Sequence, residues 1–325
     1  MSAAGVLSHP LRPLLLTAAR SQRLERGLTR MPATRRVVDR FVAGATRDSA
    51  LPAVRELLRQ NKFVSIDYLG EDTTEPAQAR RVVDQYLALI EVLAGLPAPD
   101  SEATARPLEV SLKLSALGQA LPGDGHAVAL GNARIVAAAA DAVGLWVTVD
   151  AENHTTTDST LSIVRELRQH HPETVGTVLQ AYLLRTEADC HAFAAEGARI
   201  RLCKGAYREP ESVAFQRPAE VSASYLRCLR ILMAGKGYPM VATHDPEMIE
   251  TAALLATAAG RGRDEFEFQM LYGVRPAEQD RLVRLGQRMR VYVPFGDQWY
   301  GYLVRRMAER PANLSFFLRA ATAQD

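Results

Sequence analysis

The stretch Arg199-Ile-Arg-Leu-Cys-Lys204 decides the fold of this 325-residue chain. Isoleucine and leucine alternate in it with arginine and cysteine, which is the two-residue period of a β-strand. Its two arginines and its cysteine then share one face, while the other three residues share the opposite face. Buried arginine is rare unless it is paired. The charges therefore either form structural ion pairs inside the fold or belong to a polar site.

Similar short runs with strand character occur eight times, and each is followed by a segment of helical periodicity. The runs are residues 63–68, 108–114, 145–150, 174–182, 199–204, 240–243, 266–271 and 290–294. Helices are predicted at residues 77–96, 127–143, 157–169, 187–196, 221–234, 246–259, 277–288 and 298–309. This alternation predicts an α/β fold, a closed (β/α)8 TIM-type barrel with N-terminal helices.

An open doubly wound sheet is the structural alternative. Such a sheet usually has a glycine-rich turn after its first strand, whereas Asp67-Tyr-Leu-Gly-Glu71 stands at that place. The barrel is therefore favoured. We assign residues 1–45 to an N-terminal helical segment and residues 46–325 to the barrel.

The composition excludes several classes of protein. The 39 basic and 37 acidic residues give a net charge of only +2, so no nucleic-acid partner is expected. The three cysteines form no Cys-x-x-Cys pair, which favours a reducing compartment. No apolar run reaches the ~18 residues that span a bilayer.

The first 36 residues are strongly basic, with seven arginines and a single acid, Glu25. Mitochondrial presequences have this bias. The preferred interpretation is a basic helical segment that contacts an anionic membrane surface. The expected location is the cytoplasm, with peripheral attachment to the inner membrane face as an option. The mitochondrial matrix is the alternative.

Polar residues stand at the ends of all eight predicted strands, where TIM-type barrels place their chemistry. They include Asp67, Lys113, Ser115, Asp150, Glu152, His154, Gln180, Tyr182, Arg201, Lys204, Thr243, His244, Gln269 and Tyr292. Structural ion pairs would explain one isolated charge. Eight polar strand ends favour a functional centre.

The last predicted helix carries Arg305 and Arg306. Paired guanidinium groups can bind a carboxylate with two parallel hydrogen bonds. A surface ion-pair stripe with Glu309 is the structural alternative.

Two other chemistries compete for the strand ends. His154, His244, Asp245, Asp150 and Glu152 offer ligands for a divalent ion, as in barrel hydrolases. However, no His-x-His or His-Glu-x-x-His motif is present, and no metal is predicted. Lys204 would suit a Schiff-base lyase. A catalytically silent barrel that only binds amino acids is a third possibility.

Nine motifs together resemble the proline dehydrogenase family, from about Arg36 almost to the C-terminus. They are Asp67-Tyr-Leu-Gly-Glu71, Ser111-Leu-Lys-Leu-Ser115, Asp150-Ala-Glu152, Leu179-Gln-Ala-Tyr182, Arg201-Leu-Cys-Lys-Gly-Ala-Tyr207, Thr243-His244, Phe268-Gln-Met-Leu-Tyr-Gly273, Arg290-Val-Tyr-Val-Pro294 and Tyr302-Leu-Val-Arg-Arg306. No single motif is specific for the family. Their order along the chain and their places in the predicted barrel are specific when taken together.

The resemblance implies a role for many of these residues. It implies FAD as cofactor, contacted by Ala151, Gln180, Arg201, Lys204, Gly205, Ala206, Thr243, His244 and Gln269. Asp150 and Arg201 match active-site positions. The carboxylate of L-proline would lie between Lys113, Arg305 and Arg306. The proline ring would pack against Tyr207, Leu271 and Tyr292, and Glu309 would support the arginine helix.

The implied reaction is hydride transfer from L-proline to FAD, which forms 1-pyrroline-5-carboxylate as the first step of proline catabolism. A membrane quinone is the implied electron acceptor. No aldehyde dehydrogenase module fits in the chain, so a separate pyrroline-5-carboxylate dehydrogenase is expected.

One local feature departs from the family pattern, and another favours a bulky ligand over a Schiff-base lysine. Asp245 stands where many members have asparagine, and its carboxylate would repel a flavin phosphate, so it is given no cofactor role. The glycine of Lys204-Gly-Ala206 predicts a close backbone approach to a bulky ligand.

Overall fold

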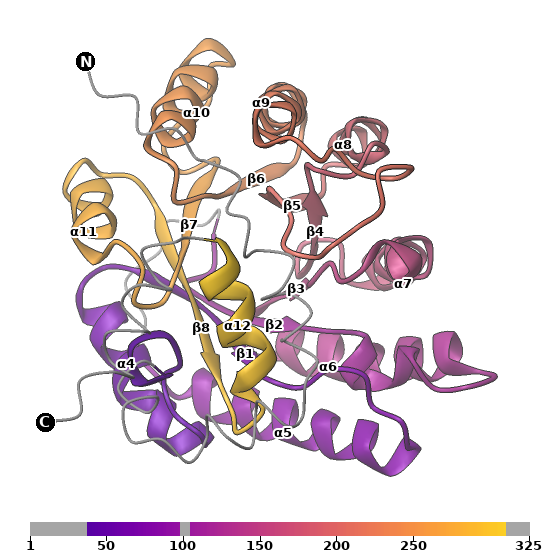
Figure 1. Ribbon diagram of the computed structural model, residues 1–325. Coiled ribbons are helices and arrows are strands. Elements are labelled where there is room, and N and C mark those ends of the chain that lie inside the picture. The colour runs from indigo at the N-terminus through magenta and orange to yellow at the C-terminus, as the bar shows by residue number, and fades with distance from the viewer. Residues whose placement is uncertain (1–37, 98–104, 310–325) are drawn as a thin grey trace, which may run out of the picture.

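Eight parallel strands close into a barrel in the order β1 to β8 (Figure 1). The computed structural model describes residues 38–97 and 105–309, with side chains as far as Val304. The strands are β1 (Phe63–Tyr68), β2 (Leu108–Leu112), β3 (Trp146–Val149), β4 (Val175–Gln180), β5 (Arg199–Cys203), β6 (Tyr238–Ala242), β7 (Glu267–Leu271) and β8 (Met289–Phe295). All eight predicted strands are confirmed.

Helices surround the strands (Figure 1). They are α4 (Arg47–Arg59), α5 (Pro76–Ala94), α6 (Gly125–Ala142), α7 (Thr157–His170), α8 (Thr186–Ala195), α9 (Pro218–Ala234), α10 (Pro246–Ala258), α11 (Pro276–Arg284) and α12 (Trp299–Glu309). The eight predicted helices correspond to α5–α12. Most predicted strand ends differ from the observed ones by one or two residues. The predictions for β2 and β4 ran two residues too far, because Lys113 leads into the π-helical turn Ser115–Gln119 and Tyr182 lies in a turn after β4.

The pairing of the first and last strands excludes the open-sheet alternative. β1 pairs with β8 in parallel over its whole length, from Phe63 opposite Arg290 to Tyr68 opposite Phe295. Every strand therefore has two neighbours. All eight C-terminal strand ends open at the same mouth.

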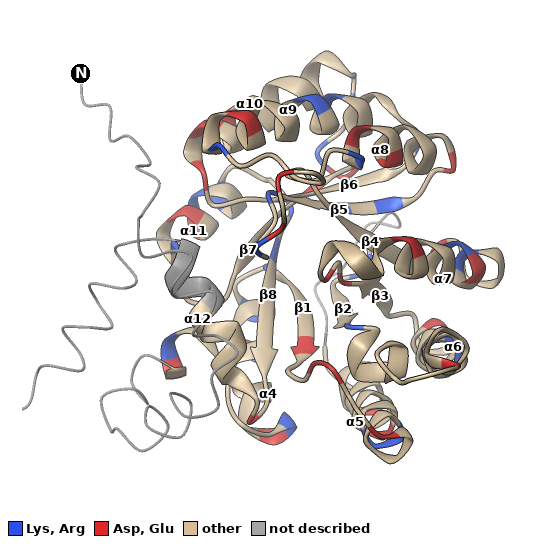
Figure 2. Ribbon diagram, turned by 45° about the vertical axis from the view of Figure 1, so that its right-hand side comes forward, with Lys and Arg blue, Asp and Glu red and all other residues tan. Residues whose placement is uncertain are grey.

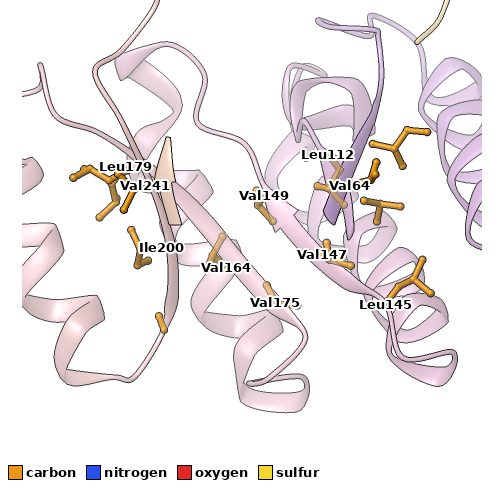
Figure 3. Close-up of a cluster of buried hydrophobic side chains, with 14 of the residues drawn as sticks. Val64, Leu112, Leu145, Val147, Val149, Val164, Val175, Leu179, Ile200 and Val241 are labelled. Carbon is orange, nitrogen blue, oxygen red and sulfur yellow. The ribbon is translucent and has the colours of Figure 1, made fainter. Parts of the chain in front are cut away.

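Apolar side chains on the outer faces of the strands pack against the helices and form the main core. Figure 3 shows part of this layer, in which Val149 and Ile200 of the strands lie near Val164 of α7. Val147, Val149, Ile200 and Val241 are fully buried. Successive side chains of a strand point to opposite faces, so the charged residues of β2, β5 and β8 that alternate with apolar ones point inward.

The first turn of α12 is anchored beside the mouth of the barrel. Tyr302 and Leu303 are buried in a cluster with Phe41, Val42 and Leu69, and Leu69 directly follows β1. Residues 38–41 are helical. Residues 42–45 follow without helix or strand, and residues 1–37 of the predicted N-terminal segment lie outside the described residues.

Within the described ranges, no helix combines the length and apolar character that a membrane span needs.

Candidate active site

Arg201 of β5 occupies the centre of the barrel interior, where it is only 5% exposed. Its guanidinium group has five N–H donors. The acceptors are Gln269 Oε1 at 2.6 Å, Ser111 Oγ at 2.9 Å, Asp150 Oδ1 at 2.8 Å, Ser65 Oγ at 2.9 Å and Glu109 Oε1 at 2.5 Å. Because every donor is used, Arg201 can act on a bound molecule through its charge, or directly if one of these contacts is exchanged.

A second layer of ion pairs lies nearer the N-terminal ends of the strands. Arg199 Nη1 is 3.1 Å from Glu109 Oε2, and Arg290 Nε is 2.6 Å from Glu267 Oε1. Burial alone would raise the pKa of Glu109, but the guanidinium groups of Arg201, Arg290 and Arg199 lower it to about 2. These charges are therefore paired inside the barrel, as the structural interpretation of the arginines predicted.

Nearer the mouth, a lysine, two carboxyl groups and a tyrosine meet. Lys113 Nζ is 2.6 Å from Asp67 Oδ2 and 3.8 Å from Asp150 Oδ2. The Tyr292 hydroxyl is 2.7 Å from Asp67 Oδ2 and 2.9 Å from Asp150 Oδ2. One hydroxyl proton cannot satisfy two ionised carboxylates. Burial raises the pKa of Asp67, and the nearby Lys113 opposes that shift. Asp67 and Asp150 therefore share the donors of Lys113 and Tyr292.

Glu152, which follows β3, joins three loops at the mouth. Its carboxylate accepts hydrogen bonds from Ser115 N at 3.0 Å and Ser115 Oγ at 2.5 Å. The Asp72 N–H reaches the same hydroxyl at 3.2 Å, and the Thr73 hydroxyl donates to the Ser115 carbonyl at 2.9 Å. Burial raises the pKa of Glu152 to about 7, although the bonds from Ser115 oppose the shift. This acid therefore titrates near neutral pH.

Lys204 lies at the end of β5 on the side of α9 and α10. Its Nζ is 3.0 Å from Asp245 Oδ2 and 3.1 Å from Ser222 Oγ. The other oxygen of Asp245 accepts the Glu247 N–H at 3.2 Å and caps the N-terminus of α10. Asp245 thus has a structural role that the sequence analysis did not assign.

The other predicted cofactor residues lie along the neighbouring strand ends. Gln180 Nε2 donates to the Glu152 carbonyl at 2.8 Å. Thr243 Oγ1 accepts the Asp245 N–H at 3.1 Å, and His244 Nε2 accepts the Leu271 N–H at 3.0 Å. These side chains are held in fixed orientations by the protein itself.

Gly205 is explained by packing within the protein. Its φ angle is +109°, in the region that favours glycine. A Cβ atom placed there would lie 2.2 Å from Cδ1 of Tyr182. The predicted close approach is therefore present, but in this structure it is to the Tyr182 ring. The ligand contact predicted for Gly205 stays a prediction.

The structure brings most of the predicted residues together at one end of the barrel, and Figure 2 shows charged residues on the strands as well as on the outer helices. Asp150, Arg201, Lys113, Tyr292 and Gln269 belong to one connected network. Ala151, Ala206, Tyr207 and Leu271 are half-buried in the adjoining strand ends and loops. The side chains of Arg305, Arg306 and Glu309 lie outside the described residues.

Several residues that contact the predicted polar residues were not themselves predicted as site residues. Glu109 shares the inward face of its strand with Ser111 and Lys113, so the two-residue period could have identified it. Arg290 is related to Tyr292 in the same way. Glu209, in contrast, lies in a loop and has no periodic signal.

Two of the side chains that were weighed as metal ligands have other partners. Asp150 pairs with Arg201, and His154 contacts Glu209. Over residues 38–97 and 105–309, no group of three or more His, Cys, Asp or Glu side chains is arranged to hold a metal ion.

Comparison with known proteins identifies the family. The family model for proline dehydrogenase matches residues 50–319. Proline dehydrogenase of Deinococcus radiodurans is 39% identical over 284 residues, and proline dehydrogenase 2 of Bacillus subtilis is 37% identical over 283 residues. Each alignment covers 87% of this chain and 89% of the relative.

The solved structures agree in fold. Proline utilization A from Bdellovibrio bacteriovorus, inactivated by N-propargylglycine, superposes with a TM-score of 0.78 at 27% identity. The match covers 89% of this chain and 34% of that one, so the chain spans about a third of that protein's length. With the family model matching most of its length, this chain belongs to the proline dehydrogenase family, whose members are oxidoreductases that act on a CH–NH bond.

Proposed function

We propose that this chain oxidises L-proline to 1-pyrroline-5-carboxylate with FAD as its cofactor, the first step of proline catabolism to glutamate. One observation carries the proposal: in a chain of this family, Arg201 of β5, Tyr292 of β8 and the residues that directly follow β2 and β3, Lys113 and Asp150, meet in one network at the barrel mouth. The family match favours this activity over the metal-dependent and lysine-dependent alternatives.

The residues at the ends of β4–β7 fit FAD by their chemistry. Lys204 offers a positive charge for a diphosphate, while Gln180, Thr243 and the backbone at Gly205 and Ala206 offer polar groups. Arg201 contributes a buried positive charge under the mouth. His244 and Gln269 complete the proposed set, together with Ala151. When bound, FAD supplies the hydride acceptor.

The substrate contacts are proposed as follows. Lys113, Arg305 and Arg306 bind the carboxylate of proline, because forked cations hold a planar anion in a fixed orientation. Glu309 supports the arginines. Tyr207, Leu271 and Tyr292 surround the ring and exclude water while the reaction proceeds.

The chemistry requires two bonds of proline to break. The hydride would leave C5 for the flavin and the ring nitrogen would release its proton to water, so that a C5–N double bond forms. Lys113 must then exchange part of its contact with Asp67 for the substrate carboxylate. Asp150 stays paired with Arg201. This pair keeps the guanidinium group in a fixed position while negative charge is transferred from the substrate at the barrel mouth.

The proposal extends to location and partners. We propose a cytoplasmic enzyme that passes its electrons to a quinone at a membrane surface. A separate pyrroline-5-carboxylate dehydrogenase would consume the product.

The test is the visible spectrum of the purified protein before and after anaerobic addition of L-proline. A yellow preparation whose flavin absorbance is bleached, with product trapped by an aromatic amino-aldehyde, supports the proposal. Unbleached flavin contradicts the substrate. A colourless preparation with bound metal indicates a hydrolase or lyase, and a colourless, metal-free one that binds proline indicates a silent barrel.

A further inference from the structure

The loop between β5 and α9 is fastened at both ends to a single residue. The Tyr182 N–H donates to the Lys204 carbonyl at 3.0 Å, and the Phe215 N–H donates to the Tyr182 carbonyl at 2.8 Å. Leu183 and Ala214 add an isolated antiparallel bridge. The loop therefore folds back onto the end of β4.

The middle of this loop is fastened by a buried acid. Glu209 is 8% exposed although its neighbour Arg208 is exposed. Its Oε1 accepts the His154 N–H at 2.9 Å and the Tyr182 hydroxyl at 3.3 Å, and its Oε2 contacts His154 Nδ1. A carboxylate leaves water at a cost of several kcal/mol unless it is hydrogen-bonded. The three contacts offset that cost only when the loop is docked.

The two ends of this contact adjoin the proposed site. Glu209 is two residues after Tyr207 and shares its loop with the turn of Lys204, Gly205 and Ala206. His154 is four residues after Asp150 and begins the short helix His154–Thr156 at the end of β3. A single side chain thus joins two segments that carry proposed site residues.

We infer that Glu209 is a positioning residue that fixes the loop of residues 204–215, and with it Tyr207, against the end of β3. Glu209 acts through His154 and Tyr182 rather than by touching the substrate. The inference rests on the proposed function only for the part that Tyr207 plays beside proline.

The experiment compares Glu209→Ala and Glu209→Gln with a matched control, Glu211→Ala. Glu211 lies on the same loop but is exposed. We expect faster hydrogen–deuterium exchange in peptides from residues 204–217 of Glu209→Ala, with exchange in β1 and α5 unchanged. KM for L-proline should rise about tenfold while kcat falls less than about threefold, because ground-state positioning is lost.

The glutamine variant separates positioning from general damage. Its amide oxygen still accepts the His154 N–H, so it should fall between wild type and Glu209→Ala in both measurements. If Glu209→Ala does not fold, the exchange and KM of Glu209→Gln alone test whether Glu209 positions the loop. The control should match wild type in exchange, flavin content and KM.

Two outcomes overturn the inference. One is hydrogen–deuterium exchange in residues 204–217 that is unchanged in both Glu209 variants. The other is a KM of Glu209→Ala for L-proline that lies within twofold of the KM of Glu211→Ala. Failure of the proposed function has a different signature. A wild-type protein that does not oxidise proline refutes that function, while the exchange comparison still decides whether Glu209 holds the loop.

Discussion

Replacing Glu152 by glutamine should stabilise the protein at alkaline pH. Burial raises the pKa of this acid from 4.5 to about 7 in the folded state. Below pH 4.5 both states are protonated and the side chain has no pH-dependent effect. Between pH 4.5 and 7 the unfolded chain releases the proton first, so the free energy of unfolding falls as pH rises, and the full loss is present above pH 7.

The size of the effect follows from the shift. Each pKa unit corresponds to about 1.4 kcal/mol, so the difference in unfolding free energy between Glu152→Gln and wild type should grow by about 2–3 kcal/mol from pH 5 to pH 8. Glutamine has nearly the same shape and stays neutral. Its oxygen can accept the Ser115 N–H and its amide can donate to the Ser115 hydroxyl.

The assay is urea unfolding of both proteins from pH 5 to pH 9, followed by circular dichroism at matched flavin content. Taking the difference removes the contributions of all other titrating groups. Glu211→Gln, at an exposed position, serves as the control and should show no trend. A Glu152→Gln difference that is flat with pH, or that shrinks as pH rises, would refute the reasoning.

Three further predictions concern the mouth of the barrel. Changing Arg305 or Arg306 to methionine should lower kcat/KM for proline by a factor equivalent to roughly 2–4 kcal/mol, with flavin content unchanged. A wild-type KM in both variants would instead favour a surface ion-pair role for these arginines. Gly205→Ala should destabilise the fold by about 2–4 kcal/mol in urea unfolding, through the positive φ and the clash with Tyr182, and an unchanged midpoint would contradict the packing argument. Steric crowding at Tyr292 should make kcat/KM for trans-4-hydroxyproline roughly ten- to a hundredfold lower than kcat/KM for proline, and the difference should be smaller in Tyr292→Ser. If the ratio of the two kcat/KM values is the same in the variant as in wild type, Tyr292 does not contact the proline ring.

The sequence was sufficient for the architecture because its local signals repeat. Strand periodicity around Arg199 and Arg201 predicts both the inward charges and the outward apolar core, and the structure confirms both. The boundaries were less certain where a strand runs into a turn, as at Lys113 and Tyr182. At such points tertiary contacts, rather than side-chain pattern, decide where regular pairing stops.

The partners of the site residues were beyond the reach of local pattern. Glu209 is 55 positions from His154, and no spacing rule connects them. Gly205 illustrates the same limit, since its sequence predicts that something approaches the backbone but not that the approaching group is Tyr182. The side chains of residues beyond Val304 remain predictions from motif alone.

The closure of the barrel has a consequence for how the chain folds during synthesis. Arg290 of β8 donates to the Val64 carbonyl of β1 at 3.1 Å, across 226 residues of chain. At roughly 5–20 residues per second, about 10–45 s separate the synthesis of these two partners. During that interval one edge of β1 has no native strand beside it. Nascent chains should therefore be most prone to aggregation, and to capture by chaperones, until Met289–Phe295 has left the ribosome.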